Sequence, residues 1–209
     1  MSSVRSTVLK AHTLTLNATK TATSGTAPNT IELYLDYACL FSAKIFDRWF
    51  NNLEDNPVVQ NNPNLQFKFV HVIQPWHPFS TLIHEVAIIV AIYKPDQFWK
   101  YSKQLFKDYS KFWRDSMIVN KSFSQLYEEL ANHAFEHVEG LDKDFILSKL
   151  VISKGKDGIV EKQVKYFTRY HRQNGVHVTP TVAVNGVIVP SIESSTDLST
   201  VDQLVRQQL

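Results

Sequence analysis

The sequence predicts an α/β fold in which a long helical insertion interrupts a small sheet. Three observations lead to this prediction. A buried strand runs directly into a helix near residue 39, a long stretch with helical periodicity follows a second strand, and an Asn-Gly hairpin with a final helix ends the chain. The expected order is therefore β-α-β, several helices, then β-β-α.

Size and composition are those of one globular domain. The chain has 209 residues, of which 44% are hydrophobic and 20% charged, so it can bury a proper core. A formal net charge of +2 gives no sign of a nucleic-acid surface, and no apolar run approaches the ~20 residues of a membrane span. A single cysteine excludes an internal disulfide, so we expect a cytoplasmic protein.

Residues 1–29 differ in character from the rest of the chain. They are rich in Ser and Thr, and no acidic residue occurs before Glu32. We favour a flexible segment with an edge strand near His12 to Asn17, where polar and apolar residues alternate. The alternative is a mitochondrial transit peptide, which would change the expected location.

Residues 30–77 form the first part of the predicted sheet domain. Thr30 to Tyr37 has the composition of a buried strand, and helical spacing begins at Leu40, which places Cys39 at the junction. Free backbone N–H groups and the helix dipole favour a negative charge there, so they favour a thiolate. Ser42 follows one turn later, where its hydroxyl can hydrogen-bond that thiolate.

The second strand and the insertion follow. Residues 51–64 are loop-like, Leu65 to Val72 alternates like a strand, and a proline-braced turn then carries Trp76 and His77. Within the insertion, residues 78–174, Ser80 or Thr81 can cap the first helix. The pattern predicts helices to residue 93 and over 95–113, 122–138, 142–151 and 156–173, with a capping box at 122–125 and an Asp cap at 142.

Residues 175–209 complete the sheet domain. Thr179-Pro180 precedes two short β runs, 181–184 and 187–189, joined by Asn185-Gly186. An Asn-Gly pair accepts the positive φ angles of a tight hairpin turn, so this is a strong hairpin signal. A final helix is expected over 197–208.

Strand, Cys39-x-x-Ser42, helix and a later Thr179-Pro180 hairpin together resemble the thioredoxin superfamily, and more closely its DsbA-like branch. The lead-in from Asp36 to Cys39 is similar to that of the DsbA-like FrnE proteins and of kappa-class glutathione transferases and isomerases. The resemblance implies a thioredoxin-like fold with a helical insertion. The chain departs from the family pattern at Leu40, where many relatives have proline, and at Ser42, which replaces a second cysteine. It also departs at Leu33, where relatives keep a buried acid that accepts a proton.

The resemblance also implies a function. Cys39 would be the nucleophile assisted by Ser42, Thr179 and Pro180 would hold the partner through a cis peptide bond, and Tyr37, Trp76 and His77 would contact it. With one cysteine, a mixed disulfide must be resolved by an external thiol, for which glutathione is the obvious candidate. We therefore expect a monothiol oxidoreductase that acts on glutathione or a thiol-bearing peptide. It would need no cofactor beyond glutathione as co-substrate.

Two other functions stay open from the sequence. One is a kappa-type glutathione transferase or isomerase, in which the residue at the helix start activates the glutathione thiol. The other is a non-catalytic binding module that kept the fold and lost the redox pair. The sequence does not indicate an oligomeric state.

A separate motif suggests metal chemistry. His133 to His137 matches the His-x-x-Glu-His of inverted zinc peptidases, with two histidines one helical turn apart. A third ligand is not marked, although Glu161 and Glu193 lie downstream. Because several glutamates surround the motif, it has the composition of a solvated helix face, and we expect no metal site.

Overall fold

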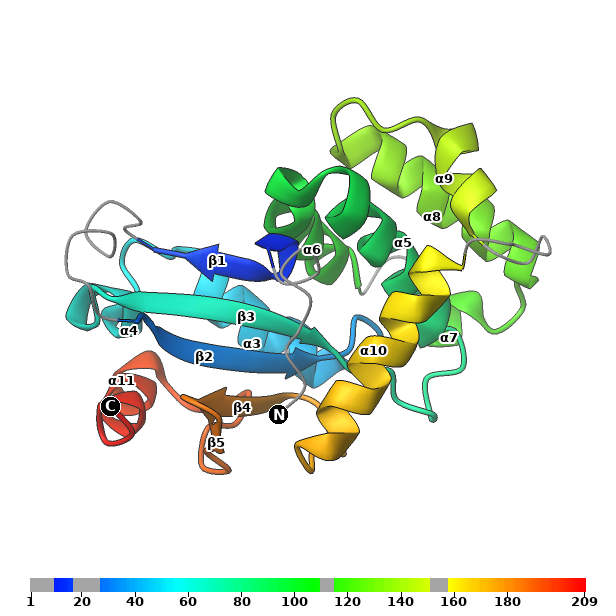
Figure 1. Cartoon of the computed structure of the whole chain (residues 1–209). Coiled ribbons are helices and arrows are strands. Elements are labelled where there is room, and N and C mark those ends of the chain that lie inside the picture. Colours follow the sequence, from blue (N-terminus) through cyan, green and yellow to red (C-terminus); the bar gives the residue numbers. More distant parts are fainter. Residues whose placement is uncertain (1–9, 17–26, 110–114, 151–157) are drawn as a thin grey trace.

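The computed structural model describes residues 10–16, 27–109, 115–150 and 158–209. Five strands form one mixed sheet in the order β1-β3-β2-β4-β5 (Figure 1). The strands are β1 (Thr13–Thr15), β2 (Asn29–Leu35), β3 (Leu65–His71), β4 (Thr181–Val184) and β5 (Val187–Ile188). β2 and β3 are parallel, and the other three pairs are antiparallel. The mixed α/β class predicted from the sequence is confirmed.

Helices surround the sheet and build the insertion. They are α3 (Leu40–Phe50), α4 (Pro57–Asn61), α5 (Ser80–Tyr93), the 3-10 helix η1 (Pro95–Gln97), α6 (Phe98–Lys107), α7 (Asp115–Ile118), α8 (Phe123–His137), α9 (Lys143–Lys149), α10 (Ile159–Gln173) and α11 (Leu198–Arg206). Figure 1 shows α5, α6, α8 and α9 gathered beyond one end of the sheet. None of the described helices is long and apolar enough to cross a membrane.

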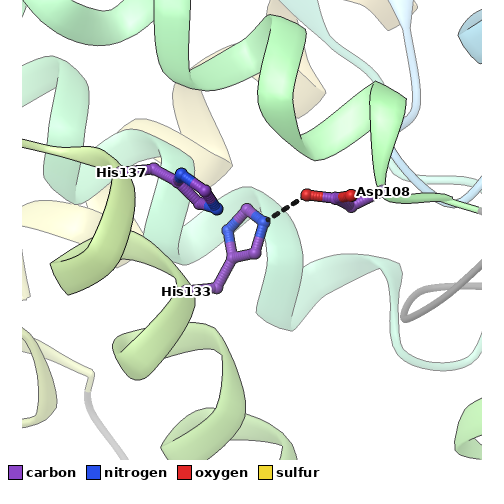
Figure 2. A group of neighbouring side chains, drawn as sticks. All are labelled: Asp108, His133 and His137. Atoms are coloured by element: carbon purple, nitrogen blue, oxygen red, sulfur yellow. Dashed lines mark hydrogen bonds and ion pairs between the residues drawn. The ribbon is translucent and has the colours of Figure 1, made fainter.

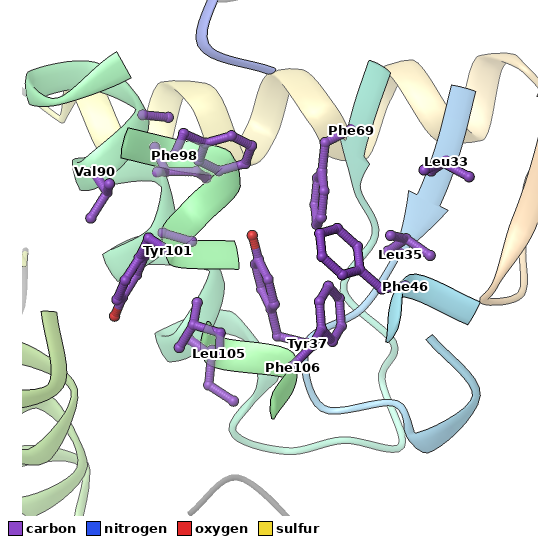
Figure 3. Close-up of a cluster of buried hydrophobic side chains, with 14 of the residues drawn as sticks. Leu33, Leu35, Tyr37, Phe46, Phe69, Val90, Phe98, Tyr101, Leu105 and Phe106 are labelled. Atoms are coloured by element: carbon purple, nitrogen blue, oxygen red, sulfur yellow. The ribbon is translucent and has the colours of Figure 1, made fainter. Parts of the chain in front are cut away.

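Alternation along the strands divides the core between two sheet faces. Tyr34 of β2 and Val70 of β3 pack with Phe167 of α10 on one face. Leu33, Leu35 and Phe69 point to the other face, where α3 and α6 cover them (Figure 3). The ring centroids of Phe46 and Phe106 lie 4.7 Å apart on this second face, so aromatic packing joins the sheet domain to the insertion.

The helix and turn signals agree with the structure at several positions. Ser122 and Gln125 form the expected capping box, and the Asp142 side chain accepts a hydrogen bond from the Phe145 N–H. The hairpin turn has positive φ at both central residues, 49° at Asn185 and 84° at Gly186. These local choices fix where each element begins.

Some boundaries differ from the prediction. The expected loop over 51–64 contains α4, because Pro57 occupies its first turn and the Asn56 side chain accepts a hydrogen bond from the Val58 N–H. α6 ends at Lys107 rather than at residue 113, and residues 110–114 lie outside the described ranges, as do residues 1–9 and 17–26 of the N-terminal segment. The transit-peptide hypothesis therefore concerns residues that are largely outside those ranges.

Candidate functional site

Cys39 lies between the end of β2 and the start of α3. It is the N-cap residue of α3, its backbone is extended, and its side chain makes no capping bond. The first turn of α3 contains no acidic residue, and the first N–H groups of a helix have no partner within it. The thiol therefore sits against the positive end of a helix, and Cys39 is buried, with 6% of its surface exposed.

The Thr179–Pro180 segment faces this thiol. The peptide bond between the two residues is cis, and the Cys39 Sγ donates to the Thr179 carbonyl oxygen at 3.5 Å. β4 starts directly after Pro180 and pairs antiparallel with β2, with Thr181 opposite Tyr34. The sheet register thus brings the cysteine and the proline to one place.

Ser42 is completely buried one turn into α3. Its Oγ accepts a hydrogen bond from the Asp36 N–H at 3.2 Å, which fastens the loop before Cys39 to the helix after it. In the described part of the chain, the hydrogen bond of the Cys39 sulfur goes to Thr179 and not to Ser42. The geometry gives Ser42 a positioning role, and the proposed assistance to the thiolate stays a prediction.

Tyr37 does not lie where the sequence prediction placed it. Its side chain is fully buried, its hydroxyl shares a 2.7 Å hydrogen bond with the Ser102 hydroxyl, and its ring packs on His84 and Phe106. An aromatic side chain at the end of a strand can point to either side of the sheet. The Tyr37 side chain enters the core between β2 and α6. The prediction that Tyr37 contacts the substrate is therefore wrong, and Tyr37 is a core residue.

Trp76 and His77 lie on a turn beside the Cys39 loop. The Gln74 N–H donates to Asp36 Oδ2 at 2.8 Å, and the Gln74 side chain donates to the His177 carbonyl at 3.2 Å. These bonds hold the turn between the loop that precedes Cys39 and the segment that precedes Thr179. Trp76 is 57% exposed there, and the contact of Trp76 and His77 with a partner stays a prediction.

A groove of about 1090 Å³ runs along the segment around Thr179 and Pro180. One wall comes from the first turns of α3, including Phe41 and Lys44, and the other from the segment before β4 and the chain after β5. Phe41 is 53% exposed, and the Lys44 Nζ lies 5.5 Å from the centroid of its ring. The groove has apolar side chains, the cations Lys44 and Arg48 and the carboxylates Asp47 and Glu193 along it, and it is open enough for an extended peptide.

Asp36 is buried beneath the loop that precedes Cys39, and both of its carboxylate oxygens accept hydrogen bonds. Its carboxylate accepts hydrogen bonds from the Ala38 N–H at 2.8 Å and the Ser80 hydroxyl at 2.6 Å, besides the Gln74 bond. Burial acts to raise the pKa of Asp36, but hydrogen bonds from His84, Ser80 and Ala38 outweigh it, so the pKa lies below its usual value. Ser80 was expected to be able to cap α5; Phe79 is the N-cap instead, because the Ser80 hydroxyl binds Asp36.

Three buried histidines continue from Asp36 into the core. The His84 Nε2 lies 3.4 Å from Asp36 Oδ1, the Nδ1 atoms of His84 and His71 lie 2.7 Å apart, and the Nε2 atoms of His71 and His12 lie 2.9 Å apart. One proton on each ring satisfies all three bonds when every ring donates toward Asp36. We call Asp36, His84, His71 and His12 the histidine chain.

A second contact bears on the protonation of His84. The Tyr37 N–H lies 3.3 Å from the same His84 Nε2, and one nitrogen cannot donate to Asp36 and accept from Tyr37 together. An ionised Asp36 favours the tautomer in which the His84 Nε2 carries the proton, because in the other tautomer the Nε2 and the Asp36 carboxylate would be two acceptors facing each other. Burial first, and then the neighbouring His12 and His84, hold the pKa of His71 well below its usual value, so the His71 ring at the centre of the chain is neutral.

The fold and the site can be compared with known proteins. A family model described as thioredoxin matches residues 20–206, and no curated protein sequence matches the chain. A solved structure proposed to be a protein-disulfide isomerase from Pseudomonas syringae is 21% identical, with a TM-score of 0.66, over 86% of this chain and 94% of that one. Oxidised BdbD from Bacillus subtilis is 16% identical, with a TM-score of 0.64, over 95% and 92%. The oxidoreductase DsbA from Xylella fastidiosa is 17% identical, with a TM-score of 0.58, over 87% of each chain.

Proposed function

Because the chain belongs to the thioredoxin family and has a DsbA-like fold, we propose that it is a thiol–disulfide oxidoreductase working through Cys39 alone. The observation that carries the proposal is the Cys39 sulfur, which sits at the start of α3 and against the Thr179 carbonyl, beside an open groove. Glutathione is the proposed second thiol, since the chain has one cysteine.

The environment of Cys39 suits a nucleophile. A thiolate is the reactive form of cysteine, and the helix start places N–H groups that have no partner within the helix, and the positive end of the dipole, beside the sulfur. The bond from the thiol to the Thr179 carbonyl keeps the sulfur aimed at the groove edge. Loss of the thiol proton breaks that bond and frees the sulfur for attack.

Thiol–disulfide exchange through one cysteine has two balanced steps. The Cys39 thiolate attacks one sulfur of a substrate disulfide, forms a mixed disulfide and releases the other substrate sulfur as a thiolate. The thiolate of glutathione then attacks the substrate sulfur of that mixed disulfide. A disulfide between substrate and glutathione leaves, and the Cys39 thiolate is regenerated with no net change in its oxidation state.

The groove explains how a partner would be held during both steps. Thr179 and Pro180 lie directly before β4 and line the groove, so an extended peptide or the glutathione backbone would pair with the backbone of this segment. The exposed Phe41 side chain offers an apolar contact in the groove, and the exposed Trp76 ring is the proposed second apolar contact. Lys44 offers a cation for a carboxylate, which glutathione carries at both ends.

A direct test is the reaction of the protein with oxidised glutathione. We expect the intact mass of the wild type to rise by one glutathione per chain and to return after reduction. Cys39→Ser should gain no mass. Ser42→Ala, which keeps the thiol, is the matched control and should still be modified.

The alternatives make different predictions in the same preparation. A kappa-type transferase would join glutathione to an electrophile and would retain activity in Cys39→Ser, where a hydroxyl can serve. A binding module would bind a thiol partner without forming a mixed disulfide. Wild type that neither reacts with oxidised glutathione nor exchanges disulfides overturns the oxidoreductase proposal.

A further inference from the structure

The two histidines of the insertion motif meet a third side chain that the sequence did not mark. His133 and His137 lie one turn apart on α8, and Asp108 follows the last turn of α6 (Figure 2). One ligand atom from each of the three residues lies within 4.8 Å of the other two. Asp108 and His133 are buried, and His137 is half-buried.

The two buried residues contact each other, with the His133 Nε2 3.1 Å from Asp108 Oδ2, and each is also oriented by a bond to a residue outside the cluster. The His133 Nδ1 lies 3.3 Å from the Tyr101 hydroxyl. The Gln104 side chain donates to Asp108 Oδ2 at 2.5 Å. Ligands of protein-bound metals are commonly held by such outer bonds, which fix the ring and the carboxylate before the ion arrives.

His137, the half-buried histidine, lies beside a hollow at the protein surface. His137 lines a hollow of about 550 Å³ together with Glu136, Glu139, Asp142 and Lys100. Three carboxylates and one ammonium group surround this entrance, so its charge favours the approach of a cation. The hollow also leaves room for water at the side of the cluster that faces solvent.

We propose that Asp108, His133 and His137 form a binding site for a divalent transition-metal ion of the zinc class. Two imidazoles and one carboxylate suit zinc and cobalt, whereas magnesium and calcium prefer oxygen ligands alone. Three protein ligands leave a fourth position for water from the hollow. The third ligand is Asp108 and not Glu161 or Glu193, because the fold brings the end of α6 against α8.

Such an ion would join two helices of the insertion. Asp108 belongs to the end of α6, and both histidines belong to α8, so one ion spans the contact between them. An ion that binds only the folded chain stabilises it by mass action. The proposal is independent of the chemistry at Cys39, which lies in the sheet domain.

The test uses the whole chain in a Cys39→Ser background, so that the thiol does not bind the probe. After treatment with a chelator, the protein is titrated with Zn²⁺ by calorimetry and with Co²⁺ by visible absorption. We expect one site per chain, cobalt bands of a four-coordinate centre, and a melting temperature that rises with Zn²⁺. Mg²⁺ and Ca²⁺ should produce no such rise.

Variants then locate the site. His137→Ala, at a half-buried position, should fold and weaken Zn²⁺ binding by more than about 100-fold, since losing a ligand exceeds the effect of an outer-bond residue. Asp108→Asn should lose the cobalt bands. Tyr101→Phe should weaken binding by about tenfold, because it removes the partner of the His133 Nδ1. His177→Ala removes an exposed histidine elsewhere and should bind as the background does.

Two results would overturn the proposal. One is the absence of saturable Zn²⁺ binding, which leaves the Asp108–His133 contact as an ordinary buried hydrogen bond. The other is equal Zn²⁺ affinity and equal thermal shift in the background protein and in His137→Ala, which would place the metal elsewhere.

Discussion

The Thr179 carbonyl oxygen lies 3.5 Å from the Cys39 sulfur, although 140 residues separate the two in the chain. A group attached to that sulfur would therefore lie against the Thr179 backbone, at the side of the groove that Thr179 and Pro180 line. This relationship explains why the proposed partner site includes the groove.

Phe41 should matter for binding more than for chemistry. Phe41→Ala removes an exposed ring at the groove edge, so we expect KM for oxidised glutathione or a disulfide peptide to rise about three- to tenfold, with kcat little changed. Steady-state kinetics measures this. Phe135→Ala, at an exposed ring on α8, is the matched control and should leave KM as it is. A fall in kcat with constant KM would contradict the placement of Phe41.

Asp36 should be important for stability. Asp36→Asn removes a buried carboxylate charge and leaves in place the N–H and O–H groups that donate to it. We therefore expect the free energy of unfolding at pH 7 to fall by about 3 kcal/mol. Urea titration followed by circular dichroism measures it. Asp96→Asn, at an exposed position, should change it by less than about 0.5 kcal/mol. Because the pKa of Asp36 is lowered on folding, its contribution is present above pH ~4 and declines as the pH falls below that value.

Three histidines with lowered pKa values, His71, His133 and His171, should make the fold sensitive to mild acid. The pKa of His71 is lowered on folding, so the unfolded chain binds its proton first as the pH falls below about 6.5. Stability should then be lost at up to about 1.4 kcal/mol per pH unit for each such histidine, and His133 and His171 add to this. Urea titrations at several pH values measure the slope. Histidine ring NMR showing a charged His71 in the folded protein at pH 6 would contradict it.

Tyr37 tests the corrected assignment. Tyr37→Phe keeps the ring and removes the hydrogen bond to Ser102, so we expect a loss of about 1 kcal/mol in unfolding free energy. Because the hydroxyl is buried away from the groove, KM should stay at the wild-type value. A rise in KM without a loss of stability would restore Tyr37 as a substrate contact.

Much of the fold was readable from local patterns. The strand before Cys39, the capping box at Ser122 and the Asn185-Gly186 turn each depend on neighbours in the sequence. α4 was missed because only five residues form it and distant partners secure it. Asn61 and Asn62 both donate to the Asp202 carboxylate of α11, and no pattern within a short window shows that contact.

The site was readable only in part. The place of Cys39 at a helix start and the neighbouring Thr179 follow from element order and family resemblance. The histidine chain was not visible, because His12, His71 and His84 lie far apart in the sequence and each looks like an isolated residue. Asp108 escaped notice for the same reason, since it approaches His133 only after α6 and α8 pack together.

His12 limits how much of the amino-terminal segment can be removed without disturbing the core. It lies directly before β1 and bonds to His71, so it anchors the first described residues to the interior. A protease that trims the chain up to Lys10 would leave this anchor in place. A cut two or three residues further on would strip a buried imidazole of its partner and detach one border of the sheet, so a matured form of the protein should start at or before Lys10.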